Sequence, residues 1–196
     1  MAATPSQMLS LGTQLPEFTL TDVVTGRPFL SSTLAGRPAV VAFICNHCPY
    51  VKHIRSELAV FGIECGERGV GFVAVSSNDA EAYPQDGPGP MAEEARVFGY
   101  SFPYLFDEQQ TVAQQFRAAC TPDFYLFDAG GKLAYRGQFD DSRPSNGKPV
   151  TGQDLRAAVE ATLSGQPPSA HQRPSIGCNI KWRRGAEPEY FAAPPR

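Results

Sequence analysis

Two cysteines three residues apart, in the stretch Cys45-Asn46-His47-Cys48, are the residues of this sequence best placed to do chemistry. At the start of a helix, unpaired N–H groups and the helix dipole favour an anion, so a thiol there loses its proton at a lower pH. A thiolate is the reactive species in thiol–disulfide exchange. We predict that Cys45 is the nucleophile and that Cys48, one turn inside the helix, closes a disulfide with it.

The flanking residues predict the elements that hold this pair. Residues 39–44 form a short apolar run rich in β-branched side chains, which is typical of a strand buried on both faces. After Pro49, apolar side chains recur at three- and four-residue spacing at Val51, Ile54, Leu58 and Phe61. This pattern predicts an amphipathic helix. The cysteines therefore lie at a strand-to-helix junction.

Other uses of a Cys-x-x-Cys pair are weaker. A zinc site normally needs a second ligand pair at similar spacing, and the sequence has none; His47, His53 and Cys178 would have to complete the site through the fold. A purely structural disulfide in so short a loop removes little entropy from the unfolded chain. We therefore predict redox chemistry, with no metal and no cofactor.

Composition limits the class of protein and the compartment to be expected. The chain has 196 residues, a net charge of −3 with mixed signs, and five cysteines. These values fit one domain of substantial size, without a nucleic-acid face, a membrane segment or a secreted disulfide scaffold. The start of the sequence also lacks the basic region and apolar core of a signal peptide. We expect a reducing cytoplasm.

The remaining chain alternates strand and helix patterns. We predict a hairpin over 16–30, a buried strand over 69–76, a polar loop over 77–90, a helix over 91–98 and a strand over 102–106. A helix capped by Asp107 and ending near Phe116 follows, then a hairpin over 124–136. The last helix runs through Leu163 and opens with a capping box at Thr151 to Asp154. This order is that of a thioredoxin-type domain: an α/β fold with a central mixed sheet flanked by helices, an N-terminal β-hairpin and an extended C-terminal tail.

Three blocks of sequence carry a family resemblance. They are Phe43 to Lys52 around the two cysteines, Cys120 to Asp128 with a Thr-Pro pair, and Tyr135-Arg136-Gly137 followed by Asp140-Asp141. Over roughly 15–163 the chain resembles the thioredoxin-like redoxins of the alkyl hydroperoxide reductase/thiol-specific antioxidant (AhpC/TSA) grouping. The resemblance implies a cis Pro122 facing the active-site disulfide. A cis proline would expose the Thr121 backbone for pairing with an extended thiol substrate.

Three functions follow as hypotheses. The first is a thiol–disulfide oxidoreductase acting on a protein or small-molecule disulfide or dithiol, in which a protonated His47 stabilises the Cys45 thiolate and makes the couple more oxidising than thioredoxin. The second is a peroxiredoxin-like peroxidase. Peroxiredoxins resemble one another in a Pro-x-x-x-Thr/Ser-x-x-Cys block; counted back from Cys45 this chain has Pro38 but Ala42, and counted back from Cys48 it has Val41 and Cys45. That departure favours disulfide exchange. The third is a metal-binding thioredoxin-like protein.

The C-terminal tail carries a further cysteine. We divide the chain into an N-terminal segment (1–14), a redoxin domain (15–165) and a tail (166–196) packed on that domain. Ile176, Ile180 and Trp182 are expected to dock the tail and to bring Cys178 near Cys45 and Cys48 as a candidate third redox thiol. Packed filler is the competing interpretation of Cys178, and buried structural roles are expected for Cys65 and Cys120.

Overall fold

Seven strands form the central sheet of the computed structural model, which describes residues 3–191. The order across the sheet is β3 (Pro28–Leu30), β2 (Thr19–Asp22), β6 (Tyr104–Phe106), β5 (Gly71–Ser76), β4 (Ala39–Phe43), β8 (Asp123–Phe127) and β9 (Leu133–Gly137). Strands β4, β5 and β6 pair in parallel, and all other neighbours pair antiparallel. The predicted mixed sheet and both hairpins are confirmed.

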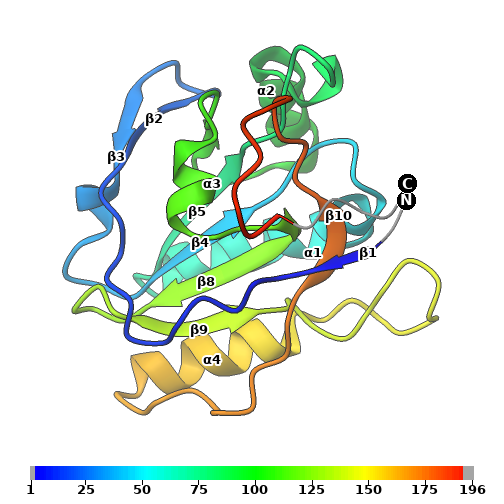
Figure 1. Cartoon of the computed structure of the whole chain (residues 1–196). Helices are drawn as coiled ribbons and strands as arrows, with labels where there is room; N and C mark the ends of the chain where they lie inside the picture. Colours follow the sequence, from blue (N-terminus) through cyan, green and yellow to red (C-terminus); the bar gives the residue numbers. More distant parts are fainter. Residues whose placement is uncertain (1–2, 192–196) are drawn as a thin grey trace.

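Helices and coil cover the two faces of this sheet (Figure 1). Side chains alternate along a strand, so Val40 and Ala42 of β4 join one apolar cluster and Val41 and Phe43 join the other. Helices α1 (Pro49–Glu67), α2 (Pro88–Phe98) and α4 (Gln153–Leu163) contribute to the first cluster, and α3 (Thr111–Gln115) to the second. Two short 3-10 helices, η1 (Ser31–Leu34) and η2 (Pro84–Asp86), complete the set of described helices.

Three further strands form a small second sheet. Its order is β1 (Ala3–Pro5), β10 (Ile176–Asn179) and β7 (Cys120–Thr121), with both pairings antiparallel. In Figure 1 the tail strand β10 lies beside β1, next to the start of α1. Ile180 and Trp182 are buried after β10, whereas Ile176 is 38% exposed, so the expected docking role of Ile176 is wrong. Residues 1–2 of the N-terminal segment and 192–196 of the tail lie outside the described residues.

Two predicted helix caps are also wrong. Helix α4 begins after Gly152, whose φ is 62°, rather than at a Thr151 capping box. The reason is that Asp140 Oδ2 accepts the backbone N–H groups of both Thr151 and Gly152, each at 2.6 Å, which fixes this turn before the helix begins. Helix α3 begins after Gln110, and Asp107 instead accepts the N–H of Ala113 within the helix at 2.9 Å.

Candidate active site

Strand β4 and helix α1 hold the two cysteines, with one difference from expectation. Helix α1 begins at Pro49, so Cys48 is its N-cap residue and does not lie one turn inside the helix. Proline is favoured at the first helical position because it has no N–H to leave unpaired and its φ already suits a helix. The free N–H groups and positive end of the dipole therefore face Cys48 rather than Cys45.

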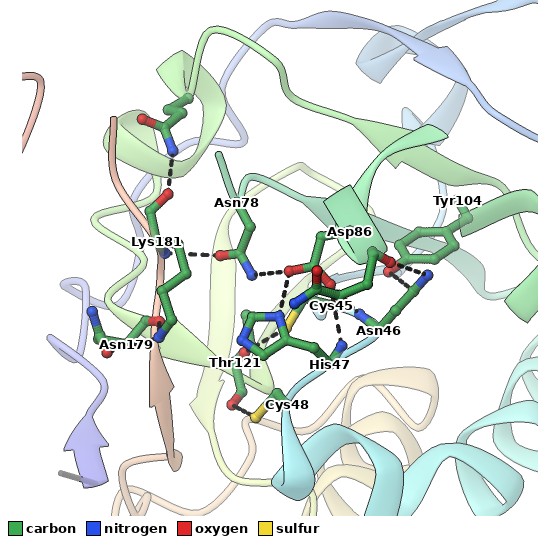
Figure 2. Close-up of polar contacts among 12 residues, drawn as sticks. Cys45, Asn46, His47, Cys48, Asn78, Asp86, Tyr104, Thr121, Asn179 and Lys181 are labelled. Atoms are coloured by element: carbon green, nitrogen blue, oxygen red, sulfur yellow. Dashed lines mark hydrogen bonds and ion pairs between the residues drawn. The ribbon is translucent and has the colours of Figure 1, made fainter. Parts of the chain in front are cut away.

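The Thr121–Pro122 segment meets both sulfurs. Its peptide bond is cis, as the family resemblance implied. The thiol of Cys48 donates to the Thr121 carbonyl at 3.1 Å, and Cys45 Sγ lies 3.3 Å from Thr121 Oγ1 (Figure 2). All three residues are buried, with Cys45 and Cys48 exposed by only 1% and 0%. Thr121 thus binds the two thiols through two different groups.

The surroundings of the two thiols act on their pKa values in opposite directions. The neighbouring thiols of Cys178 and Cys45 lower the pKa of Cys48, although burial acts in the opposite direction. Burial raises the pKa of Cys45, and the neighbouring Cys48 and the negative charge of Asp86 raise it further. These directions favour a thiolate on Cys48, which would give up its contact with the Thr121 carbonyl on losing its proton, and the assignment of Cys45 as nucleophile stays a prediction.

Asp86 is the central residue that sequence reasoning missed. It lies in η2 and is fully buried. Its Oδ1 accepts the backbone N–H groups of Asn46 and His47 at 2.9 and 3.1 Å, and its Oδ2 accepts His47 Nδ1 at 2.5 Å and Asn78 Nδ2 at 2.8 Å (Figure 2). Burial raises the pKa of Asp86, but bonds from His47 and Asn78 outweigh it and the pKa is lowered. A carboxylate with four N–H donors fixes the Cys-x-x-Cys loop.

His47 is oriented by this carboxylate rather than by a sulfur. Its ring is bonded to Asp86 and stacks on Tyr83, with centroids 5.3 Å apart and an interplanar angle of 11°. His47 is not among the main groups that shift the pKa of Cys48 or of Cys45. His47 therefore supports the site by shaping the loop, which differs from the expected direct stabilisation of a Cys45 thiolate.

A metal ion does not fit this arrangement well. Cys45, His47 and Asp86 offer ligand atoms that lie within 4.8 Å of one another. However, both oxygens of Asp86 already accept two N–H groups each, and His47 Nδ1 is one of the donors. A metal would have to displace these bonds from a buried carboxylate. We therefore interpret Asp86 as a carboxylate held by hydrogen bonds rather than as a metal ligand.

Strand β10 brings Cys178 into the site. Cys178 pairs with Thr121, whose carbonyl contacts Cys48, and the Cys178 side chain lowers the pKa of Cys48. Beyond β10, the backbone N–H of Lys181 donates to Asn78 Oδ1 at 2.8 Å, so the tail is linked through Asn78 to Asp86 (Figure 2).

The other two cysteines lie apart from this cluster of bonds. Cys65 is buried on α1, and burial raises its pKa to about 12. Cys120 is fully buried on β7, where its thiol faces the Pro122 carbonyl at 3.7 Å and burial again raises its pKa. Neither environment favours a reactive thiolate.

Comparison with known proteins agrees with this geometry. The model of the AhpC/TSA family matches residues 11–136. The chain belongs to the AhpC/TSA family. A search of curated proteins finds no match. Among the described residues, no helix is both long and apolar enough to cross a membrane.

Three solved structures illustrate the similarity. An uncharacterised conserved protein from Geobacillus kaustophilus is 51% identical with a TM-score of 0.93, covering 95% of this chain and 99% of its own. A hypothetical protein from Sinorhizobium meliloti is 48% identical with a TM-score of 0.90, covering 93% and 100%. A thiol:disulfide interchange protein of the thioredoxin family from Chlorobium tepidum is 19% identical with a TM-score of 0.60, covering 79% and 98%, and shares the fold.

Proposed function

We propose that this protein is a thiol–disulfide oxidoreductase with a role in antioxidant defence and redox homeostasis, in which Cys48 is the nucleophile and Cys45 its partner thiol. The observation that carries the proposal is the position of Cys48 as the N-cap of α1, where neighbouring groups lower the pKa of its thiol. Membership of the AhpC/TSA family supports a redox enzyme.

The reaction follows from the two sulfur environments. The Cys48 thiolate attacks one sulfur of a disulfide substrate, forming a mixed disulfide and releasing the first substrate thiolate. Cys45 then attacks Cys48 Sγ, so that the Cys45–Cys48 bond forms and the second substrate thiolate leaves with the proton of Cys45. The substrate gains two electrons and the cysteine pair loses two. Thr121 Oγ1, 3.3 Å from Cys45 Sγ, orients the attacking thiol.

A second candidate is a thiol peroxidase. Burial of both sulfurs favours a small oxidant such as a hydroperoxide. In that reaction Cys48 attacks the terminal peroxide oxygen, the O–O bond breaks, and a sulfenic acid forms as the alcohol leaves. Attack of Cys45 on the sulfenic sulfur then releases water and gives the same disulfide.

One experiment separates the two candidates. Reduced protein is mixed with a protein disulfide and, separately, with hydrogen peroxide, and Cys48 oxidation is followed by quenching, alkylation and peptide mass. We expect reaction with the disulfide, loss of that reaction in Cys48→Ser, and retention in the matched control Cys65→Ser. Rapid oxidation by peroxide alone would assign the peroxidase. A Cys48 that reacts with neither would refute both.

The cellular setting is part of the proposal. We propose a reducing compartment such as the cytoplasm, because five cysteines in 196 residues lack the density of a secreted disulfide scaffold. The expected partners are protein or small-molecule disulfides and dithiols, or hydroperoxides. The metal-binding alternative is disfavoured because the oxygens of Asp86 are already engaged, and a zinc assay on reduced protein tests it.

A further inference from the structure

The edge of β7 beside the cis proline is already occupied. An extended thiol substrate would pair there with the Thr121 backbone, but strand β10 of the same chain does so instead. Cys178 lies opposite Thr121 and Asn179 opposite Cys120, and the ladder continues with the Ile180 N–H donating to the Ala119 carbonyl at 3.0 Å. The tail therefore lies where a substrate peptide would bind.

The fit of β10 to this edge is close. A Cβ atom built on Gly177 would lie 1.9 Å from the Thr121 carbonyl oxygen and 3.1 Å from Pro122 N, so only a glycine is accommodated. The close contact between the Gly177 and Thr121 backbones brings the next residue, Cys178, beside Cys48. The sulfur of Cys48 lies 3.1 Å from the same Thr121 oxygen.

The strand is also held on both sides. Strand β1 pairs with its other edge, with Ala3 opposite Cys178. After the strand, the Lys181 carbonyl accepts the Asp79 N–H at 2.8 Å and Gln110 Nε2 at 2.9 Å, and the Lys181 N–H donates to Asn78. The pairing with β1 and the bonds of Lys181 thus fix the position of Cys178, which is 3% exposed.

We propose that β10 is a tethered substrate strand, and that Cys178 is a second disulfide partner of Cys48. The proposal rests on the proposed function, which supplies the Cys45–Cys48 disulfide. The sulfur of Cys178 attacks Cys48 Sγ, so that the Cys48–Cys178 bond forms and the Cys45–Cys48 bond breaks. The bonding electron pair leaves with Cys45 Sγ, which takes the proton lost by Cys178. The number of disulfides is unchanged, so the step needs no oxidant or reductant.

The position of Cys48 makes this exchange direct. Thr121 contacts the sulfurs of both Cys48 and Cys45, and Cys178 lies opposite the same residue on β10, so the Cys48 sulfur has a thiol neighbour on the loop and another on the tail. A disulfide requires Cα atoms within about 7 Å unless the backbone moves. Pairing of β10 with β7 holds Cys178 opposite Thr121, the residue whose carbonyl contacts Cys48.

Mapping of disulfides tests the proposal. Reduced full-length protein is treated with one equivalent of diamide, quenched in acid and alkylated, and its peptides are mapped without reduction. We expect both the Cys45–Cys48 and the Cys48–Cys178 bond in the wild type. Cys45→Ser should leave only Cys48–Cys178, with loss of alkylation at both residues, and Cys178→Ser should leave only Cys45–Cys48. The matched control Cys65→Ser should give the wild-type pattern.

The outcomes separate the two proposals. A wild type in which Cys48 stays fully alkylatable would refute the proposed function. If the Cys45–Cys48 bond forms in the wild type and in Cys178→Ser, but Cys178 remains alkylatable in the wild type and in Cys45→Ser, the tethered strand alone is refuted. The disulfides mapped in the wild type, sampled at successive times after diamide is added, test the proposal even if Cys45→Ser does not fold.

Discussion

Substitution of Gly177 by alanine should release the tail strand from the active site. The added Cβ would lie 1.9 Å from the Thr121 oxygen, and contacts below 3.0 Å require a shift, so β10 must move by about 1.1 Å. A hydrogen bond of 3.0 Å, such as that from Ile180 to Ala119, does not survive a displacement of that size. Two or three ladder bonds, each contributing about 0.5–1.5 kcal/mol, would be lost.

This loss sets the size of the effect. The seated tail would be destabilised by roughly 1–4 kcal/mol, which corresponds to about a fivefold or greater rise in the population of the released tail. We therefore expect alkylation of Cys178 in reduced Gly177→Ala to be at least ~5-fold faster than in the wild type. Reaction with a protein disulfide should also gain relative to reaction with a low-mass disulfide, because the freed edge of Thr121 can pair with a polypeptide.

Matched measurements make the test sharp. Gly66→Ala in α1 is the control, because no atom lies within 4 Å of the added Cβ and alanine suits a helix. Emission of Trp182, the single tryptophan of the chain, reports whether the buried tail segment beyond β10 is exposed, and far-ultraviolet circular dichroism reports the overall fold. Alkylation of Cys178 at the wild-type rate in a folded Gly177→Ala protein would refute the reasoning.

Three further predictions concern charge. Asp86→Asn should lower the pKa of Cys45, because a negative charge is removed, and should lower the unfolding free energy by about 1–3 kcal/mol through mispaired N–H groups. The pKa of the Asp86 carboxyl is lowered in the folded protein, so the wild type should lose this stabilisation as the pH falls below about 4, and Asp86→Asn should not. Titration of the Cys45 thiol checks the first effect, and denaturation at several pH values checks the second. Burial raises the pKa of Asp123 to about 7, so wild-type stability should decrease as the pH rises from about 4 to 7, and Asp123→Asn, compared by urea denaturation, should abolish that decrease. Cys178→Ala should raise the pKa of Cys48, because the side chain that lowers it most is removed, and alkylation of Cys48 should then need a higher pH.

Local patterns predicted the elements that carry the site. The buried strand before Cys45 and the helix after Pro49 were both predictable, because their periodicity reflects burial on two faces and on one face. The expected place of Cys48, one turn inside the helix, was wrong because the helix begins at Pro49. Pro49 is the sequence feature that could have located it, since proline at the first helical position makes the preceding residue the N-cap.

Contacts between segments far apart in the sequence could not be predicted from local patterns. Asp86 lies in a stretch whose composition predicts only a polar loop, and its importance arises because η2 packs it under a loop 40 residues earlier in the sequence. The position of Cys178 was anticipated from the apolar residues near it, but the pairing of β10 with β7 was not. Pairing between strands far apart in sequence leaves no local period to read.

Asn78 connects the two parts of the site in a way that has a thermodynamic consequence. Its Nδ2 donates to Asp86, which fixes the Cys-x-x-Cys loop, and its Oδ1 accepts the backbone N–H of Lys181, which holds the tail. Seating of the tail therefore orders the same amide that orients the carboxylate near Cys45. Because coupling between two sites is reciprocal, a change in the Cys-x-x-Cys loop on oxidation must alter the seating of β10 by the same free energy with which the seated tail alters the loop. The tail and the Cys-x-x-Cys loop are thus coupled through one amide side chain.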